Sequence, residues 1–253
     1  MTVAAAIPIL NESRNIGAVI EAVKRHVDAV LVIDDGSTDD GATVAQLSGA
    51  EVLQHPSNQG KGRALASAIR WTRSHPEIDW LVLLDGDGQH DPGDIDHLVD
   101  AAIEGQLDVC VGSRFIGESN VPFYRVLGLH VLSATAALGS GVYLSDSQSG
   151  FRVLSRSAID QLDLREGGFS VESEMQFHAG RIPLRVGEKP ISIRYAGPAR
   201  RSPVVHGVSV LFRTLSLTAH HRPARLLLMV LLPFTLVRLS RARGRTDNES
   251  SLA

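Results

Sequence analysis

The sequence predicts an α/β protein with a mostly parallel sheet and helices on both of its faces. Short apolar runs typical of buried strands alternate with segments that carry apolar residues at helical spacing, and the connections between them are short. The size agrees, because 253 residues of which 43% are hydrophobic are ample for one such domain followed by a tail.

The first half of the chain accounts for most of the expected sheet. Strands are expected at residues 3–10, 29–33, 51–53, 80–84 and 107–111. Between them, a first helix is expected to carry Ile16, Val19, Ile20 and Val23 after a cap at Asn11 or Ser13, and further helices are expected at residues 39–48, 63–73 and 93–104. In sheets of this kind ligands bind beyond the carboxyl ends of the strands, so the residues that follow each strand are candidates for a functional site.

The second half is less regular. Helices are expected at residues 122–139 and 169–179, a strand is expected to begin near Arg152, and a last strand is expected at 191–195. A flexible basic loop at 196–203 would close the domain. We therefore expect one domain over residues 1–203 and a tail over residues 204–253.

Four successive strand ends carry polar side chains that folding alone does not require, namely Asn11/Glu12, Asp34/Asp35, Asp85/Asp87 and Arg114. The stretch 85–92 is the richest, because two carboxylates and the amide of Gln89 follow a buried strand, with glycines that let a ligand approach the backbone. Hard oxygen donors of this kind suit Mg²⁺ or Mn²⁺, which commonly share their coordination with substrate phosphates. The alternative is an acidic turn that only caps the next helix.

A glycine-rich turn at residues 58–62 leads into the third expected helix. It is not a P-loop, because G-x-x-x-x-G-K-[ST] is absent, and no G-x-G-x-x-G opens the first helix. Lys61 in this turn is either a phosphate ligand or a solvated residue at the start of the helix.

Charge is distributed unevenly along the chain. Residues 1–120 hold 19 acidic against 8 basic residues, whereas residues 121–253 hold 9 against 17. An acidic half that can hold a metal and a basic half that faces an anion is the simplest interpretation. The anion would be a nucleotide phosphate, a phosphorylated acceptor or a membrane surface. The single cysteine, Cys110, excludes a disulfide framework, and no signal peptide is expected from the start of the chain.

Seven short motifs occur in order along residues 3–203, and together they make a specific signal. They are Pro8-x-x-Asn11-Glu12, Asp34-Asp35-Gly36-Ser37, Asn58-x-Gly60-Lys61-Gly62, Asp85-Gly86-Asp87-Gly88-Gln89-His90, Gly112-Ser113-Arg114, Asp146-x-x-Ser149-Gly150-Phe151-Arg152 and Glu174-Met175. With them the chain resembles glycosyltransferase family 2, which has the GT-A fold, and within it the dolichyl- and polyprenyl-phosphate sugar transferases.

This resemblance implies a donor site for a GDP- or UDP-sugar. The nucleoside pocket would be lined by Pro8, Leu10, Glu12, Ile33 and Asp35. Asp85 would lie by the ribose and the metal, while Asp87 and Gln89 would hold Mg²⁺ or Mn²⁺ against the diphosphate of the donor. Lys61 would be a further ligand of the nucleotide.

The resemblance also implies an acceptor side and an inverting displacement. Arg114 would face the phosphate of a polyprenyl or dolichyl phosphate, and Arg200 or Arg201 would close over the donor. The basic loop departs from the ending common in the family, which leaves the division of roles between these two arginines open. A phosphate acceptor needs no general base, whereas a hydroxyl acceptor would need one, for which Glu174 is the candidate.

Several alternatives stay open at this stage. Residues 34–37 could form a plain turn, and Arg114 or Arg152 could pair with Asp146. Glu172 and Glu174 lie two apart on a helix and diverge, so that one of them at most belongs to the site. His90 and His206 are expected to be surface residues or neighbours of ligands. A non-catalytic module that binds nucleotide sugars or docks on membranes is the competing class, although its metal residues should then have decayed; nucleic acid is not an expected partner.

The tail has the pattern of a membrane-associating segment. Apolar residues recur at helical spacing from Val204 to Leu215, and the apolar run 226–237 has arginines on both sides. Twelve helical residues span about 18 Å, too short for a hydrocarbon core of about 30 Å. We expect amphipathic and apolar helices that lie on the cytoplasmic face of a membrane, as a peripheral attachment. The alternative is helices that pack in a core or an oligomer contact.

Overall fold

The computed structural model describes residues 1–116, 123–164 and 171–193, with positions 212, 215–216 and 218–219, and of residues 123–131 the backbone alone. The expected basic loop, the boundary at residue 203 and the apolar run at 226–237 lie outside the described residues.

The described part alternates strands and helices, as the sequence predicts. The strands are β1 Val3–Ile9, β2 Ala29–Asp34, β3 Glu51–Gln54, β4 Trp80–Leu83, β5 Val109–Ser113, β6 Arg152–Ser155 and β7 Val186–Pro190. The helices are α1 Ile16–Val23, α2 Gly41–Leu47, α3 Lys61–Arg73, α4 Asp94–Glu104, α5 Phe123–Ser140, α6 Arg156–Gln161 and α7 Val171–Ala179.

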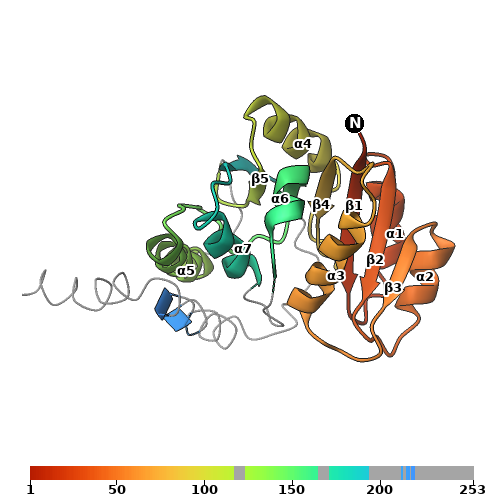
Figure 1. Cartoon of the computed structure of the whole chain (residues 1–253). Helices are drawn as coiled ribbons and strands as arrows, with labels where there is room; N and C mark the ends of the chain where they lie inside the picture. The colour runs from red at the N-terminus through yellow and green to blue at the C-terminus, as the bar shows by residue number, and fades with distance from the viewer. Residues whose placement is uncertain (117–122, 165–170, 194–211, 213–214, 217, 220–253) are drawn as a thin grey trace, which may run out of the picture.

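The strands form one sheet in the order β3-β2-β1-β4-β6-β5-β7. Figure 1 shows the neighbouring strands β3, β2, β1 and β4, with β5 farther along. All neighbouring pairs are parallel except those of β6, which runs antiparallel to both β4 and β5. The mostly parallel sheet is therefore confirmed. Because β6 is reversed, the segment that leads into it reaches the edge at which the other strands end.

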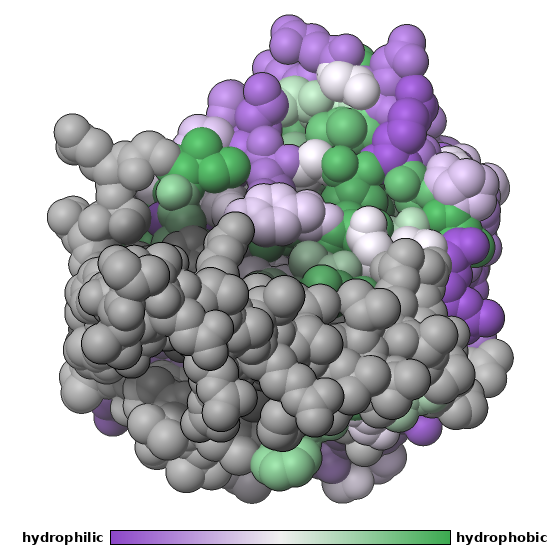
Figure 2. Space-filling view, turned by 90° about the vertical axis from the view of Figure 1, so that its left-hand side faces the viewer, coloured by the Kyte–Doolittle hydropathy of each residue, from purple (hydrophilic) through white to green (hydrophobic). Residues whose placement is uncertain are grey.

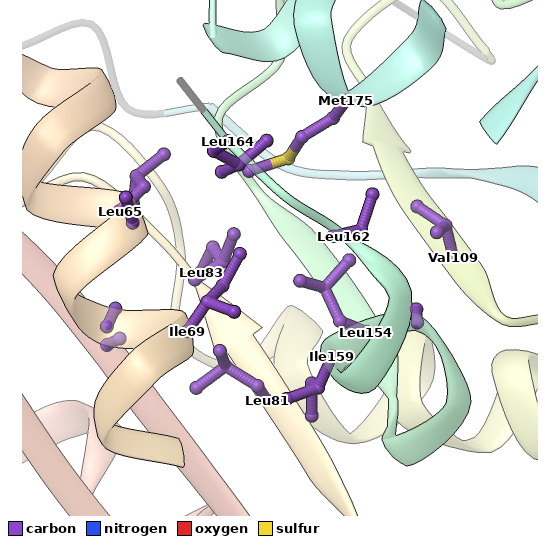
Figure 3. Close-up of a cluster of buried hydrophobic side chains, with 14 of the residues drawn as sticks. Leu65, Ile69, Leu81, Leu83, Val109, Leu154, Ile159, Leu162, Leu164 and Met175 are labelled. Carbon is purple, nitrogen blue, oxygen red and sulfur yellow. The ribbon is translucent and has the colours of Figure 1, made fainter. Parts of the chain in front are cut away.

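Two apolar cores lie on the two faces of the sheet, and the alternation of side chains along β1 separates them. Ala4 and Ala6 join the core formed with α3, α6 and α7, and Ala5 and Ile7 join the one formed with α1 and α4. Figure 3 shows the first core, in which Leu65 and Ile69 of α3 face Leu81 and Leu83 of β4 and the side chains beyond. Helices thus cover both faces, as predicted.

Two elements differ from the sequence prediction. Among the described residues the last strand is β7 at Val186–Pro190, and of the strand expected at 191–195 Ile193 forms a single antiparallel bridge with His90. Ile191 is placed against the apolar core near Gly112. In the described part of that segment the apolar Ile191 therefore reflects packing at the sheet edge rather than a strand.

The short helix α6 was not predicted, and two arginines fasten it to α3. The guanidinium of Arg156 donates to the carbonyl oxygens of Thr72, Arg73, His75 and Ile78 at the end of α3. In the opposite direction, the guanidinium of Arg73 in α3 donates to the carbonyl oxygens of residues 159, 160 and 162 at the end of α6. Arg73 thus binds carbonyls that the C-terminal end of α6 leaves without an intrahelical partner, and Arg156 holds the end of α3 and the turn after it against α6.

The side of the molecule that carries α5 exposes large apolar residues. Leu138 and Tyr143 are more than half exposed there, and Phe212 is exposed as well. In the space-filling view from this side, hydrophobic residues gather between hydrophilic edges in the described part of the surface (Figure 2). Within the described residues, no helix has both the length and the apolar character needed to cross a bilayer.

Candidate active site

The strand order changes direction between β1 and β4, and the candidate site lies at the carboxyl ends of these two strands. Glu12 follows β1, Asp35 follows β2, and Asp85 and Asp87 follow β4. Since β6 runs the other way, the residues at 146–151 arrive at the same edge from a distant part of the chain. The geometry brings the predicted carboxylates together, while their chemical roles stay predictions.

Asp85 is bound by a buried lysine. Lys61 Nζ lies 2.7 Å from Asp85 Oδ1 and 2.8 Å from Glu172 Oε1, so one ammonium group bridges carboxylates from β4 and α7. Burial alone would raise the pKa of Asp85, but the charge of Lys61 outweighs it and holds that pKa below its usual range. Burial likewise opposes the charge of Lys61, whose pKa is nevertheless raised by Asp85 and Glu172. Lys61 is therefore not the solvated residue that the sequence left open.

Gly150 is the residue of the 146–151 segment that touches this pair. A Cβ atom at Gly150 would lie 2.9 Å from both Asp85 Oδ2 and Lys61 Nζ, closer than side-chain carbons come to such atoms. Only glycine lets the main chain pass here without displacing the ion pair. The motif Ser149-Gly150-Phe151 is thereby explained by a contact with residues 60 to 90 positions earlier in the chain.

Unlike Asp85, Asp87 forms no ion pair with the residues that the structure describes. Burial and then the negative charge of Asp85, with a smaller contribution from Glu12, raise the pKa of Asp87 above its usual range. Its Oδ1 accepts a hydrogen bond from the backbone N–H of Gln89 at 3.0 Å, and the Gln89 side chain is exposed.

This donor set fits a divalent cation. Such a cation would offset the repulsion between Asp85 and Asp87, and carboxylate and amide oxygens are the ligands that Mg²⁺ and Mn²⁺ prefer. Among the residues that the structure describes, no group of three or more His, Cys, Asp and Glu side chains is arranged to hold a metal. Asp85, Asp87 and Gln89 remain the predicted metal ligands.

His90 lies between Phe151 and the backbone of the acidic stretch at residues 85–89. Its ring packs on Phe151 with centroids 5.2 Å apart, and the backbone N–H of Asp85 donates to His90 Nδ1 at 3.3 Å. Burial lowers the pKa of His90 to about 4, so the ring is neutral at neutral pH and Nδ1 is free of a proton. His90 thus neighbours the candidate ligands, which is the position expected for it.

Asp35 fastens the glycine-rich turn to the end of β2. Its two oxygens accept hydrogen bonds from the backbone N–H groups of Gln59 at 2.9 Å and Gly60 at 2.7 Å, and His55 Nδ1 lies 2.7 Å from Oδ1. Ser37 N donates to Asp34 Oδ1 at 3.0 Å, which makes residues 34–37 a turn as well. The turn that carries Lys61 is therefore positioned by Asp35.

The remaining residues predicted for the nucleoside pocket differ in accessibility. Pro8 and Leu10 are partly exposed on either side of the buried Ile9 at the end of β1, and Glu12 is buried and accepts a hydrogen bond from Asn15 Nδ2 at 3.0 Å. Ile33 is fully buried in the core beneath α3, so it can reach a nucleotide only through its main chain.

Arg114 is held by Asp146 at the end of β5. Its Nε and Nη2 each lie 2.6 Å from one oxygen of Asp146, in a bidentate pair, and its backbone N–H donates to the same carboxylate. Glu188 of β7 accepts hydrogen bonds from the N–H groups of Ser145 and Asp146, which fixes the loop. The pairing that the sequence left open is thus present, and it leaves the Arg114 side chain 23% exposed.

Arg152 is a structural residue. Its side chain is 1% exposed and donates to the carbonyl oxygens of Ser147, Ser149 and Glu172, at 2.8, 2.9 and 3.1 Å. It therefore ties the 146–151 segment to the start of α7. The sequence did not predict this role, because carbonyl partners leave no trace in side-chain identity.

Of the two glutamates of α7, Glu172 is the one that contacts Lys61, whereas Glu174 Oε1 lies 4.0 Å from His178 Nε2. Glu174 was named from the sequence as the candidate base, and Glu172 received no role. Residue type and helix position do not separate the two, because both are buried in the first turn of α7 and only the position of Lys61 distinguishes them. Arg200, Arg201 and His206 lie outside the described residues.

Comparisons with known proteins show the family of this chain. The family described as "Glycosyl transferase family 2" matches residues 5–163. A UDP-N-acetylglucosamine–dolichyl-phosphate N-acetylglucosaminyltransferase of Methanococcus voltae is 30% identical over 236 residues, covering 83% of this chain and 94% of the relative. A polyprenol monophosphomannose synthase of Mycolicibacterium smegmatis is 30% identical over 204 residues, covering 74% and 75%.

Solved structures share the fold. Glucosyl-3-phosphoglycerate synthase from Mycobacterium tuberculosis in complex with UDP superposes with a TM-score of 0.68 at 25% identity, covering 86% of this chain and 80% of the synthase. A structure of the same synthase with Mn²⁺ and UDP-glucose gives a TM-score of 0.67. The α/β fold predicted from the sequence is confirmed by this likeness.

Proposed function

We propose that this chain, which belongs to glycosyltransferase family 2, transfers a hexose with inversion from a nucleotide sugar to a polyprenyl or dolichyl phosphate. The product would be a lipid-linked sugar for glycan or glycoprotein assembly. The observation that carries the proposal is Arg114, which Asp146 holds in a bidentate pair at the end of β5, at the same edge of the sheet as Asp85. Relatives named for dolichyl phosphate and polyprenol phosphate support the choice of acceptor.

On the donor side, Asp85, Asp87 and Gln89 would hold Mg²⁺ or Mn²⁺. The metal, when bound, would stabilise the negative charge that builds on the departing nucleoside diphosphate. Asp87 is suited to this role because its carboxylate is crowded by Asp85 and Glu12 in the absence of a cation. The synthase of similar fold has been crystallised with Mn²⁺ and UDP-glucose, which supports a divalent ion and a nucleotide sugar here.

The backbone around the nucleotide would be positioned by Asp35. Because Asp35 binds the N–H groups of Gln59 and Gly60, it holds the glycine-rich turn next to the strand ends. Pro8, Leu10 and Glu12 would approach the nucleoside from the end of β1, and Ile33 would do so through its main chain. Arg200 or Arg201 would close over the donor.

On the acceptor side, the chemistry of a phosphate nucleophile removes the need for a base. A phosphate monoester has a second pKa near 6 and is largely dianionic at neutral pH. It must be placed by cations so that one oxygen is in line with the anomeric carbon. A guanidinium held in a bidentate pair is pre-organised for that task, because its orientation is fixed before the acceptor arrives.

A hydroxyl acceptor is the second candidate. It is favoured by the likeness to glucosyl-3-phosphoglycerate synthase. A hydroxyl must lose a proton during transfer, so this candidate requires a general base, and Glu174 is the residue that we assign to it. The two candidates therefore make opposite demands on Arg114 and Glu174.

Attachment to the cytoplasmic face of a membrane would bring the enzyme to its acceptor. The exposed Leu138, Tyr143 and Phe212 and the arginine-flanked run at 226–237 support a peripheral contact with anionic lipid. The catalytic domain over residues 1–203 and the tail over 204–253 would then have separate tasks.

The deciding experiment compares Arg114→Ala with Glu174→Gln at saturating nucleotide sugar, with Mn²⁺ and polyprenyl phosphate present. Arg114→Ala should lower turnover by about 100-fold, the effect of losing one charge-stabilising donor, while nucleotide affinity stays nearly unchanged. Glu174→Gln should lower it far less, because no proton is removed from the nucleophile. Circular dichroism checks that both variants are folded.

A reversed order would contradict the phosphate acceptor. Loss of a general base typically costs 10²–10⁴-fold. A nearly inactive Glu174→Gln variant beside an active Arg114→Ala variant would therefore indicate a hydroxyl acceptor. Arg185→Ala, at an exposed arginine of the same half that pairs with Asp108, is the matched control and should keep wild-type turnover.

A further inference from the structure

Lys61 stands where helix geometry does not favour a cation. It is the first residue of α3, and the N-terminal end of a helix carries partial positive charge. Its side chain is nevertheless turned inward, with 16% exposure, and Nζ contacts one oxygen of Asp85 and one of Glu172. The two carboxylates, not the helix, hold the ammonium group in place.

The two carboxylates differ in accessibility. The side chain of Asp85 is 32% exposed, whereas that of Glu172 is 5% exposed. Glu172 is also fixed by its main chain, because Arg152 Nη1 donates to its carbonyl oxygen at 3.1 Å. Glu172 is thus the immobile partner of Lys61, and Asp85 is the partner that a ligand can reach.

The main chain at Gly150 restricts the ammonium group further. Atoms of Lys61 and Asp85 lie so close to Gly150 that a Cβ there would come within 2.9 Å of each. Of the other groups around Asp85, His90 Nδ1 accepts the hydrogen bond of the Asp85 backbone N–H, and the Arg114 guanidinium is paired with Asp146. An ammonium that leaves Asp85 therefore has Glu172 beside it as a carboxylate to stay with.

We propose that Lys61 is an internal counter-ion that a divalent cation displaces from Asp85, and that Glu172 is the positioning residue that retains it. This inference rests on the proposed function, because it takes Asp85 as a metal ligand. In the metal-free protein the ammonium group of Lys61 contacts the Asp85 carboxylate that the metal would bind. When the metal binds, the contact between Lys61 and Asp85 is exchanged for a contact between Asp85 and the metal.

Glu172 makes this exchange feasible because a buried ammonium group without a partner is unfavourable. With Glu172 in place, Lys61 loses one of two carboxylates and keeps the other. Glu172→Gln removes the charge but keeps an oxygen acceptor of the same size. Lys61 then depends on Asp85 alone and competes more strongly with the metal.

The test is Mn²⁺ binding to the full-length protein, followed by the electron paramagnetic resonance signal of free Mn²⁺. Glu172→Gln should weaken binding by about tenfold, because a charge pair at contact distance is strong in a partly buried site. Lys61→Met, which removes the competing ammonium, should strengthen it. In the Lys61→Met background, adding Glu172→Gln should have a much smaller effect, because no lysine remains to be retained.

A matched control is available on α1, where Glu21 lies 4.0 Å from Lys24 in an exposed pair. Glu21→Gln removes the same charge from an ordinary lysine–glutamate pair and should leave Mn²⁺ binding unchanged. Circular dichroism establishes that each variant is folded. If Lys61→Met does not fold, Lys61→Gln takes its place in the series.

Two results would overturn the inference. Wild-type Mn²⁺ affinity in Glu172→Gln would show that Glu172 does not retain the lysine. If Glu172→Gln lowers Mn²⁺ affinity equally in the wild-type and Lys61→Met backgrounds, Glu172 acts only by attracting the metal with its own negative charge and not by retaining Lys61. In both cases wild-type protein binds Mn²⁺ and the proposed function stands. If wild-type protein binds no Mn²⁺, the metal role of Asp85 fails, and the inference fails with it.

Discussion

The two halves of the molecule bury different kinds of side chain. Up to β4, the buried polar residues gather mainly at strand ends, while the strands themselves are apolar. Beyond β5, polar residues are buried throughout the segment that enters β6 and along α7. They are Asp146, Ser147, Ser149, Arg152, Glu172, Ser173, Glu174 and Gln176.

The comparison shows how each half holds its part of the site. Apolar packing tolerates adjustment, because any side chain of suitable volume fills the space. A buried polar network depends on each partner, because a missing one leaves a desolvated group unsatisfied. The donor side therefore rests on a robust parallel sheet, and the contacts that reach it from the second half rest on individual hydrogen bonds.

The largest expected effect is on stability, at Arg152. Arg152→Met keeps much of the volume but leaves the carbonyls of Ser147, Ser149 and Glu172 without their donor. We expect the free energy of unfolding to fall by about 4 kcal/mol, the range for buried acceptors left unsatisfied. Urea denaturation followed by circular dichroism measures it.

Arg185→Met supplies the control in the same half. Its side chain is 58% exposed, so the substitution should change the free energy of unfolding by less than about 0.5 kcal/mol. A loss at Arg152 as small as at Arg185 would break the comparison, because the polar network would then not stabilise the second half.

The next effect is on activity, at Asp87 in the first half. Asp87→Ala should lower turnover by about 100-fold or more, roughly 3 kcal/mol, because the charge developing on the leaving diphosphate loses its compensation. Stability should not fall, since burial and Asp85 already disfavour the charged form of Asp87. Full activity in this variant, or in wild-type protein with EDTA, would contradict the metal site.

The smallest effect is a pH dependence of stability at His90. Because its folded pKa is about 4 against 6.5 for the free residue, the unfolded chain binds a proton that the folded protein does not, between these values. Stability from this group is present above about pH 6.5 and declines as pH falls toward 4. We expect a loss of about 2 kcal/mol between about pH 7 and pH 5.

The variant His90→Gln should flatten that part of the profile, when unfolding is followed by urea denaturation at each pH. An unchanged slope in the variant would mean that other groups cause it. In that case the pH dependence of the free energy of unfolding would not come from the buried histidine at the acidic strand end.

Local patterns were sufficient for most of the fold. The alternation of Ala4, Ala5, Ala6 and Ile7 between two cores follows from period-2 geometry, and short connections imply parallel pairing. The prediction of strands and helices from the spacing of apolar residues was wrong where tertiary packing, and not local periodicity, determines the structure. Ile191 packs at the edge of the sheet instead of extending a strand, and α6 is a short helix whose C-terminal carbonyls are bound by Arg73 of α3.

By itself the sequence determined the α/β class, the family resemblance and the acidic strand end at Asp85 and Asp87. These follow from residue types at short spacing, which local chain geometry translates directly into structure. Only the tertiary structure decided that Lys61 bridges Asp85 and Glu172, that Gly150 lies against this pair, and that Arg152 binds the carbonyl of Glu172. Those contacts join residues far apart in the chain, and the reversal of β6 that brings them together is a property of the whole sheet.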